Sequence, residues 1–172
     1  MARRIAPAGS ATAPDLAPQV LETWRRANDI LLALLAGVPE DGFGALPTGS
    51  RGRTVALQFA HLDRVRREWL EYHLTGKQAR LPRADKTRPP TPAELKQALR
   101  ESGKDVADYL ARALRGEEKT RMFGGQPVRW MAYLIAHEAH HRGQILLALK
   151  QSGHRMSDKV ALEGMWGSWM SS

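Results

Sequence analysis

Two histidines one helical turn apart are the residues in this chain most able to do chemistry. Residues 136–144 read AHEAHHRGQ and contain His137, Glu138 and His141 in the order His-Glu-x-x-His. On a helix, side chains four positions apart project from one face, so His137 and His141 can bind one metal ion. Zinc peptidases use the same spacing, with the glutamate as the general base that activates a zinc-bound water. The motif leaves two interpretations open, a peptidase or another metal site.

The peptidase interpretation is weakened by the wider sequence. The metzincin pattern requires a glycine three residues and a histidine six residues after the second histidine, where this chain has Gln144 and Leu147. A more distant glutamate ligand would be Glu163, which lies in a short segment rich in glycine and tryptophan. Peptide substrates also commonly pair with a sheet edge, and no strand is predicted. We therefore expect Glu138 to face solvent or a neighbouring helix.

A third ligand is expected from another helix, because metal sites in helical bundles are assembled from facing side chains. His61 is the best candidate, since it lies on the apolar stripe of a predicted helix between Leu57 and Val65. The other histidines fit less well: His73 is predicted at the frayed end of that helix, His154 follows a glycine that ends a helix, and His140 points off the face of the pair. The alternative is a set of hydrogen-bonded core histidines without a metal.

The segments that position these residues have helical spacing, and none shows the alternation of a strand. Apolar residues recur three and four positions apart in four segments, residues 18–36, 54–76, 91–115 and 127–153. The clearest start is TPAE, in which Thr91 caps the helix, Pro92 takes its first position and Glu94 closes a capping box. We predict an all-α fold, a four-helix bundle in which each helix adds one stripe to a shared core.

Two features near the end of the chain make further predictions. Gly143, inside the last long helix, predicts that another helix approaches closely there. The closing segment, residues 157–170, is expected to form one or two turns of helix and to pack on the bundle. Its Trp166 and Trp169 are predicted to cover the core or to form an oligomer contact.

Length and composition indicate a single domain. The chain has 172 residues, of which 42% are hydrophobic, enough for one sizeable core. We assign residues 15–172 to this domain and predict that residues 1–14 form a disordered tail. Cysteine is absent, which excludes disulfides, thiolate ligands and a cysteine nucleophile. No apolar run has the length of a signal peptide or a membrane span, so we expect a cytoplasmic protein with no membrane partner.

Basic residues are concentrated in one part of the chain. The net charge is +8, and residues 51–88 contribute +6 of it, with ten Lys or Arg residues against four acidic ones. This segment could form an anion-binding surface, although a solvated basic face is the plainer interpretation. A nucleic-acid partner is the less favoured alternative.

Several stretches resemble one known family. LQFAHLDRVRREWL around His61, HEAHHRGQILLAL from His137, the N-terminal helix TWRRANDILLALLAGVP and the closing tryptophan segment resemble the DinB/YfiT-like superfamily of metalloenzymes. The resemblance covers about residues 18–170. It implies a bundle with an up-down-down-up arrangement, and a metal site of His61, His137 and His141 with water positions left open. It also implies a homodimer.

The resemblance implies a chemistry as well. Three neutral imidazoles leave a dipositive, open site that can lower the pKa of a bound water or thiol. Relatives in the superfamily include thiol S-transferases that use bacillithiol or mycothiol and a mycothiol-dependent isomerase. A low-molecular-weight thiol is therefore the expected cofactor beside a zinc, nickel or iron ion. We expect a metal-dependent transferase or hydrolase that acts on a small molecule, with a non-enzymatic metal-binding stress-response protein as the alternative.

Four more residues are candidates for roles around the site. Arg64 and Arg67 could hold the carboxylates of the thiol, although exposed helix positions are the plainer interpretation. Gln144 and Arg142 could orient the ligand imidazoles, which normally need a partner for the ring nitrogen that does not bind the metal. Arg142 could instead form a structural ion pair.

Overall fold

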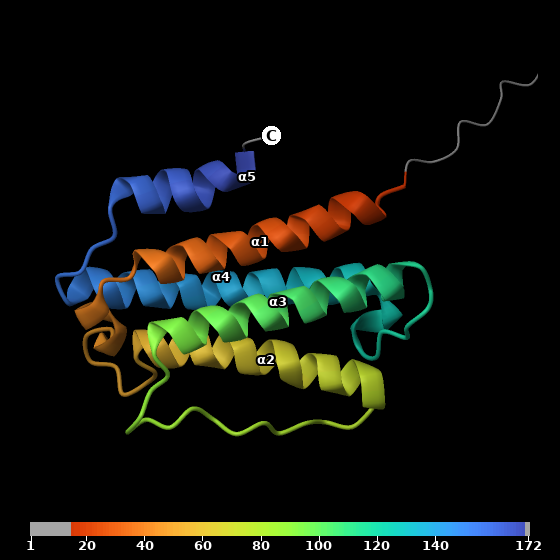
Figure 1. The fold of residues 1–172 in the computed structure, drawn as a ribbon, viewed down its shortest axis with the longest axis horizontal. Helices are drawn as coiled ribbons and strands as arrows, with labels where there is room; N and C mark the ends of the chain where they lie inside the picture. The colour runs from red at the N-terminus through yellow and green to blue at the C-terminus, as the bar shows by residue number, and fades with distance from the viewer. Residues whose placement is uncertain (1–14, 171–172) are drawn as a thin grey trace, which may run out of the picture.

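The computed structural model describes residues 15–170, and these residues form helices and no strands. Four long helices are joined by connections that include short helical turns (Figure 1). The elements in chain order are α1 (Ala17–Gly37), η1 (Glu40–Gly44), α2 (Val55–Thr75), α3 (Pro92–Leu114), η2 (Phe123–Gly125), α4 (Pro127–Gln151), η3 (Lys159–Gly167) and α5 (Ser168–Met170). The predicted all-α class is confirmed. The predicted disordered tail, residues 1–14, lies outside the described residues.

The ends of the long helices follow local signals in the sequence. Thr54 caps α2 by accepting a hydrogen bond from the Leu57 amide, and Thr91 with Glu94 forms the predicted capping box of α3. Gly76 ends α2 with a φ of 75°, a left-handed conformation that favours glycine. Because these signals are local, the predicted boundaries of the four long helices lie within about two residues of the observed ones.

The four long helices lie side by side (Figure 1). Both α1 and α2 contact α3 and α4. Since α2 and α3 run in the same direction, the connection between them returns along the outside of α2 (Figure 1). This return brings Arg83 and Lys86 of the connection to the same hollow as His61 on α2.

A buried ion pair lies among the four long helices. Arg66 of α2 and Glu138 of α4 are 0% and 1% exposed, and hydrogen bonds of 2.6 and 3.0 Å join the guanidinium to both carboxylate oxygens. Arg66 also donates to the Asn28 side chain in α1 and to the Leu99 carbonyl in α3. One side chain thus bonds to each of the other three long helices. Because a buried charge without partners is costly, this network helps to fix how α2 faces α4.

Apolar side chains of all four long helices form two buried clusters. One contains Leu31, Phe59, Leu99 and Leu149 among others, and the second contains Trp24, Tyr109, Leu110 and Trp130. The polar faces of the helices remain towards solvent, as expected of amphipathic helices. None of the helices in residues 15–170 is both long enough and apolar enough to cross a membrane.

The closing segment packs on α1. Both η3 and α5 contact α1, Met165 is buried, and Trp169 is partly buried against the core. Trp166, however, is 66% exposed, so the prediction that it packs on the bundle is wrong. The segment η3 is a π-helix, whose turns are wider than those of an α-helix, and the inward position falls on Met165 instead.

The predicted close approach at Gly143 is also wrong. Gly143 is exposed, and a Cβ added there would meet no described atom within 4 Å. The close approach is at Gly103 in α3, where an added Cβ would collide with Asn28 of α1. The Gly103 carbonyl there accepts a 2.8 Å hydrogen bond from the Trp24 indole. A glycine inside a helical pattern therefore does not by itself identify the face on which helices meet.

Candidate metal centre

The structure brings the three predicted ligands together. His61 lies on α2, and His137 and His141 lie one turn apart on α4. The ring centroid of His61 is 5.3 Å from that of His137 and 4.7 Å from that of His141, and the His137 and His141 centroids are 4.6 Å apart. One ligand nitrogen of each ring lies within 4.8 Å of the other two. We call these three residues the histidine cluster.

The donor atoms of the histidine cluster fit a metal ion. Zinc–imidazole bonds are about 2.0–2.1 Å long, so two ligands of a tetrahedral ion lie about 3.3 Å apart. Small side-chain rotations would bring nitrogens that now lie within 4.8 Å to that separation. In addition, Nδ1 of His137 is buried and has no hydrogen-bond partner within residues 15–170. A buried polar atom without a partner needs an explanation, and here it belongs to one of three converging imidazoles, where a metal ion would supply the missing partner.

The surroundings of the cluster keep its imidazoles neutral. Burial is the main cause that lowers the pKa of all three histidines. The pKa of His61 falls to about 3, with Arg53 as the next cause, and the pKa of His141 falls to about 4, with His137 as the next cause. Neutral imidazole is the form that binds metal, so at neutral pH no proton has to leave the cluster first.

Gln58 is the residue that contacts a cluster imidazole most closely. Its side-chain oxygen lies 2.6 Å from Nδ1 of His141 and can only accept, so Nδ1 carries the proton and Nε2 of His141 is left free. The amide nitrogen of Gln58 donates to Oε1 of Gln144, and the amide nitrogen of Gln144 lies 2.8 Å from Nε2 of His140. Gln144, the predicted partner of a ligand, therefore bonds to Gln58, and a side-chain hydrogen bond from Gln144 also acts on His141, where it opposes the lowering of the pKa by burial. Gln58 was not predicted from the sequence. Its position three residues before His61 places both side chains on one face of the helix, which is the signal that could have identified it.

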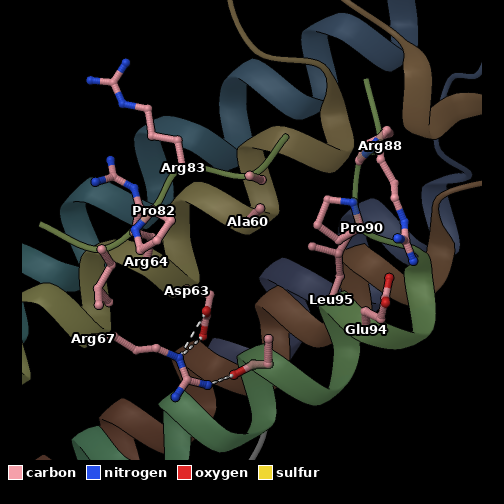
Figure 2. A pocket seen from close by; sticks show the side chains of 14 residues that line it. Ala60, Asp63, Arg64, Arg67, Pro82, Arg83, Arg88, Pro90, Glu94 and Leu95 are labelled. Carbon is pink, nitrogen blue, oxygen red and sulfur yellow. Dashed lines mark hydrogen bonds and ion pairs between the residues drawn. The ribbon is translucent and has the colours of Figure 1, made fainter. Parts of the chain in front are cut away.

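The two predicted cofactor-binding arginines have different surroundings. Arg64 donates to Nδ1 of His61 at 3.3 Å and pairs with Glu68 at 2.6 Å, so it lies beside the cluster. Arg67 pairs with Asp63 at 3.0 Å and donates to the Ala98 carbonyl of α3. Figure 2 shows Arg67 bonded to Asp63 while Arg64 points to the other side. Of the two predicted arginines, Arg64 is therefore the one placed to contact a molecule at the cluster.

Arg142 does not take the role predicted for it. No hydrogen bond joins it to a cluster imidazole within residues 15–170, and its buried Nη1 has no partner there. Burial lowers its pKa, and Glu138 acts in the opposite direction. Within residues 15–170 no ion pair or hydrogen bond joins Arg142 to Glu138, whose two oxygens each accept from Arg66.

Glu138, the glutamate of the His-Glu-x-x-His motif, faces a neighbouring helix. Its carboxylate is 1% exposed and both oxygens accept from Arg66 of α2. A carboxylate held in this way is not free to take a proton from a metal-bound water, as a peptidase requires. Sequence reasoning missed Arg66 as the partner. The signal was its position four residues after Leu62 and four before Leu70, both of which are buried.

The remaining histidines lie outside the cluster. His73 is 1% exposed and its ring packs against Tyr109 and Trp130, so the prediction of a frayed position was wrong. His140 is exposed, and Nδ1 of His154 lies 3.5 Å from Asp41. Among residues 15–170, only the cluster has three histidine or carboxylate ligands close enough to hold one ion.

The fold and the site define an all-helical protein with a three-histidine centre compatible with metal binding. The model of the DinB family matches residues 10–160, which is most of the chain. The chain therefore belongs to the DinB family. No curated protein matches it.

Proposed function

We propose that this protein is a metal-dependent enzyme in which His61, His137 and His141 hold a divalent zinc, nickel or iron ion. The observation that carries the proposal is the convergence of three neutral imidazoles from two helices, with ligand nitrogens within 4.8 Å of one another. Membership of the DinB family supports it. A divalent ion with an open position supplies a Lewis acid that lowers the pKa of a water or thiol.

The proposed reaction is hydrolysis of a small molecule, or attack of a low-molecular-weight thiol on a small electrophile, which forms a carbon–sulfur bond as a leaving group departs. The chain has no cysteine, so any thiol nucleophile has to arrive with a cofactor. A glutamate acting as general base is not part of the proposal, because Glu138 is bonded to Arg66.

The residues around the cluster orient it. The Gln58 oxygen accepts a hydrogen bond from Nδ1 of His141, which fixes the tautomer that presents Nε2 to a metal. Arg64 can only donate, so it bonds to a nitrogen of His61 that carries no proton. Because Glu68 is a second partner for Arg64, the guanidinium remains paired if His61 turns towards a metal.

Metal content per chain tests the site directly. The protein should be purified without an affinity tag or added metal and measured by plasma mass spectrometry, beside His61→Ala and the matched control His154→Ala, a histidine outside the cluster that contacts Asp41. We expect about one metal ion per chain in the parent protein and the control, and a large loss in His61→Ala. Absence of metal after reconstitution, or equal content in all three proteins, would contradict the proposed site.

Turnover separates the enzyme from a metal-binding protein without activity. Metal-loaded protein should be assayed with low-molecular-weight thiols plus electrophiles, and separately with ester and amide substrates. We expect turnover in one assay and its loss in His61→Ala. Stable metal with no turnover in either assay would favour the non-enzymatic metal-binding stress-response protein.

We propose two further features of the assembly. The four long helices form an up-down-down-up bundle, which is supported by the directions of the chain in Figure 1: α1 and α4 run one way and α2 and α3 the other. The protein is a homodimer, which is supported by exposed apolar residues of the closing segment, namely Leu162, Trp166 and Met170. Light scattering should give the mass of two chains, and the mass of one chain would contradict the dimer.

A further inference from the structure

A hollow of about 310 Å³ opens directly beside the histidine cluster. His61 forms part of its wall, together with five cationic residues, namely Arg51, Arg53, Arg64, Arg83 and Lys86. These residues come from the loop before α2, from α2 itself, and from the connection that returns along α2. Two segments far apart in sequence thus contribute positive charge to one concave surface.

Acidic residues within residues 15–170 neutralise only one of the five positive charges of this hollow. No acidic residue lines it. Among the five cations, only Arg64 makes an ion pair, with Glu68 at 2.6 Å, when all acidic residues of 15–170 are considered. The pKa of Arg53 is lowered by burial and then by the charges of Arg64 and Arg83, so the guanidinium groups repel one another. Such a set of like charges is costly unless an anion binds among them.

The neighbouring hollow provides an internal comparison. It has a volume of about 440 Å³ and lies between α2 and α3, where Arg67 pairs with Asp63 (Figure 2). Figure 2 shows Arg64 and Arg83 next to each other, with their guanidinium groups turned away from that pair. Arg64 and Arg83 line both hollows, but the neighbouring hollow is also lined by the acidic residues Asp63 and Glu94, whereas the hollow beside the cluster has no acidic residue in its wall.

The shape of the hollow favours a small ligand over a nucleic acid. A volume of about 310 Å³ suits one small molecule, and the wall ends at a residue of the histidine cluster. None of the lining residues is a Trp, Tyr or Phe, so bases would have no aromatic surface to stack on. Of the three aromatic residues of the basic segment, Trp69 and Tyr72 line a different hollow and Phe59 is buried in the core. Arginine guanidinium groups bind carboxylates and phosphates through paired hydrogen bonds.

We propose that this hollow binds the anionic group, a carboxylate or a phosphate, of the small molecule on which the protein acts, with Arg53 and Arg83 as its main contacts. This inference rests on the proposed function in one respect: it places the reacting part of the same molecule against the histidine cluster. Anion binding itself requires no metal.

Calorimetric titration with inorganic phosphate and, separately, with succinate tests the proposal and distinguishes the two anion types. The full chain should be used with and without bound metal, at low ionic strength, beside Arg53→Gln, Arg83→Gln and the control Arg100→Gln. Arg100 is exposed on α3 and lines neither hollow, but its replacement changes the net charge equally. Loss of one charge-assisted contact should raise the Kd roughly tenfold or more in both hollow variants and leave the control unchanged.

The outcomes separate this proposal from the metal site. Retention of probe binding in His61→Ala, with loss in Arg53→Gln and Arg83→Gln, would support the hollow even if the proposed metal chemistry failed. Binding lost in His61→Ala but kept in both arginine variants would put the anion on the metal and overturn the proposal. No binding of either probe, or equal weakening by Arg100→Gln, would also overturn it. A single-stranded oligonucleotide that binds more tightly than either probe, through Arg53, would overturn it in favour of a nucleic-acid surface.

Discussion

The helices α2 and α4 meet in two polar clusters that differ in how their hydrogen-bonding groups are used. In the Arg66–Glu138 pair, both carboxylate oxygens accept from the guanidinium, and the remaining Arg66 nitrogen donates to Asn28 and to the Leu99 carbonyl. In the histidine cluster, by contrast, Nδ1 of His137 has no partner within residues 15–170. Buried polar groups that bond to one another stabilise the fold. Polar groups that converge and keep an atom without a hydrogen-bond partner are available to bind an ion or a ligand.

The two clusters share one turn of α4. His137 belongs to the histidine cluster and Glu138, the next residue, belongs to the ion pair. Successive residues on an α-helix point about 100° apart, which is enough to turn the two side chains towards different partners. A His-Glu-x-x-His motif on a helix therefore does not require that its glutamate act at the metal.

Replacement of Glu138 by alanine should have the largest effect on stability. It leaves the guanidinium of Arg66 buried without its carboxylate, which costs about 3–5 kcal/mol of the free energy of unfolding. Urea unfolding of metal-free protein measures this loss. Glu163→Ala is the matched control, because Glu163 is exposed and makes no ion pair within residues 15–170. The folded fraction of Glu138→Ala should still bind metal.

A different result would remove the distinction between the two clusters. Loss of metal binding by Glu138→Ala with unchanged unfolding free energy would place Glu138 at the metal and not in a structural pair. Replacement of both partners, Arg66→Met with Glu138→Leu, should recover most of the lost stability, because a buried pair exchanged for apolar residues of similar size costs little.

The second prediction extends the comparison to His73, a buried histidine outside the cluster. Burial, and then Arg121, lowers the pKa of His73 to about 4, and its Nδ1 accepts a 3.1 Å bond from the Arg121 amide. The unfolded imidazole has a pKa of about 6.5, so between pH 6.5 and 4 the unfolded state binds more protons. The stabilising contribution of neutral His73 is therefore complete above about pH 6.5 and is lost as the pH falls towards about 4.

His73→Phe should reduce this dependence on pH. Phenylalanine keeps the ring contacts to Tyr109 and Trp130 but takes up no proton. As the pH falls from about 6.5 to about 4, the parent protein should therefore lose up to about 3 kcal/mol more of its free energy of unfolding than His73→Phe does. Unfolding of the metal-free proteins across this range measures the difference. An identical dependence on pH in both proteins would assign all of it to other groups, including the histidine cluster.

The helices were predictable from local signals, and the contacts between them were only partly so. The caps at Thr54 and Thr91 act within one turn, so the sequence alone located the starts of α2 and α3. The histidine spacing on α4 likewise indicated one face, whereas the choice of His61 relied on an apolar stripe and a family resemblance. Arg66 and Gln58 were missed because their partners, Glu138 and His141, lie on another helix. Which pairs of helix faces meet depends on the packing of the whole chain.

The smallest predicted effect concerns Gln58, which belongs to neither of the two polar clusters but bonds to the histidine cluster. Its oxygen accepts a 2.6 Å hydrogen bond from Nδ1 of His141, and loss of a partner of this kind weakens metal affinity by about 10- to 100-fold. Gln58→Ala should therefore bind metal more weakly, yet still reach the parent stoichiometry when metal is in excess. Competition with a chelating dye measures the affinity, with Gln97→Ala, an exposed glutamine on α3, as the control.

A conservative variant separates orientation from general packing. Glutamate at position 58 keeps an oxygen that can accept from Nδ1 of His141, although it gives up the bond that Gln58 donates to Gln144. Gln58→Glu should therefore retain most of the metal affinity that Gln58→Ala loses. Equal affinities in the alanine variant and the parent protein would show that His141 needs no fixed tautomer. The cluster would then depend, unlike the Arg66–Glu138 pair, on its three imidazoles alone.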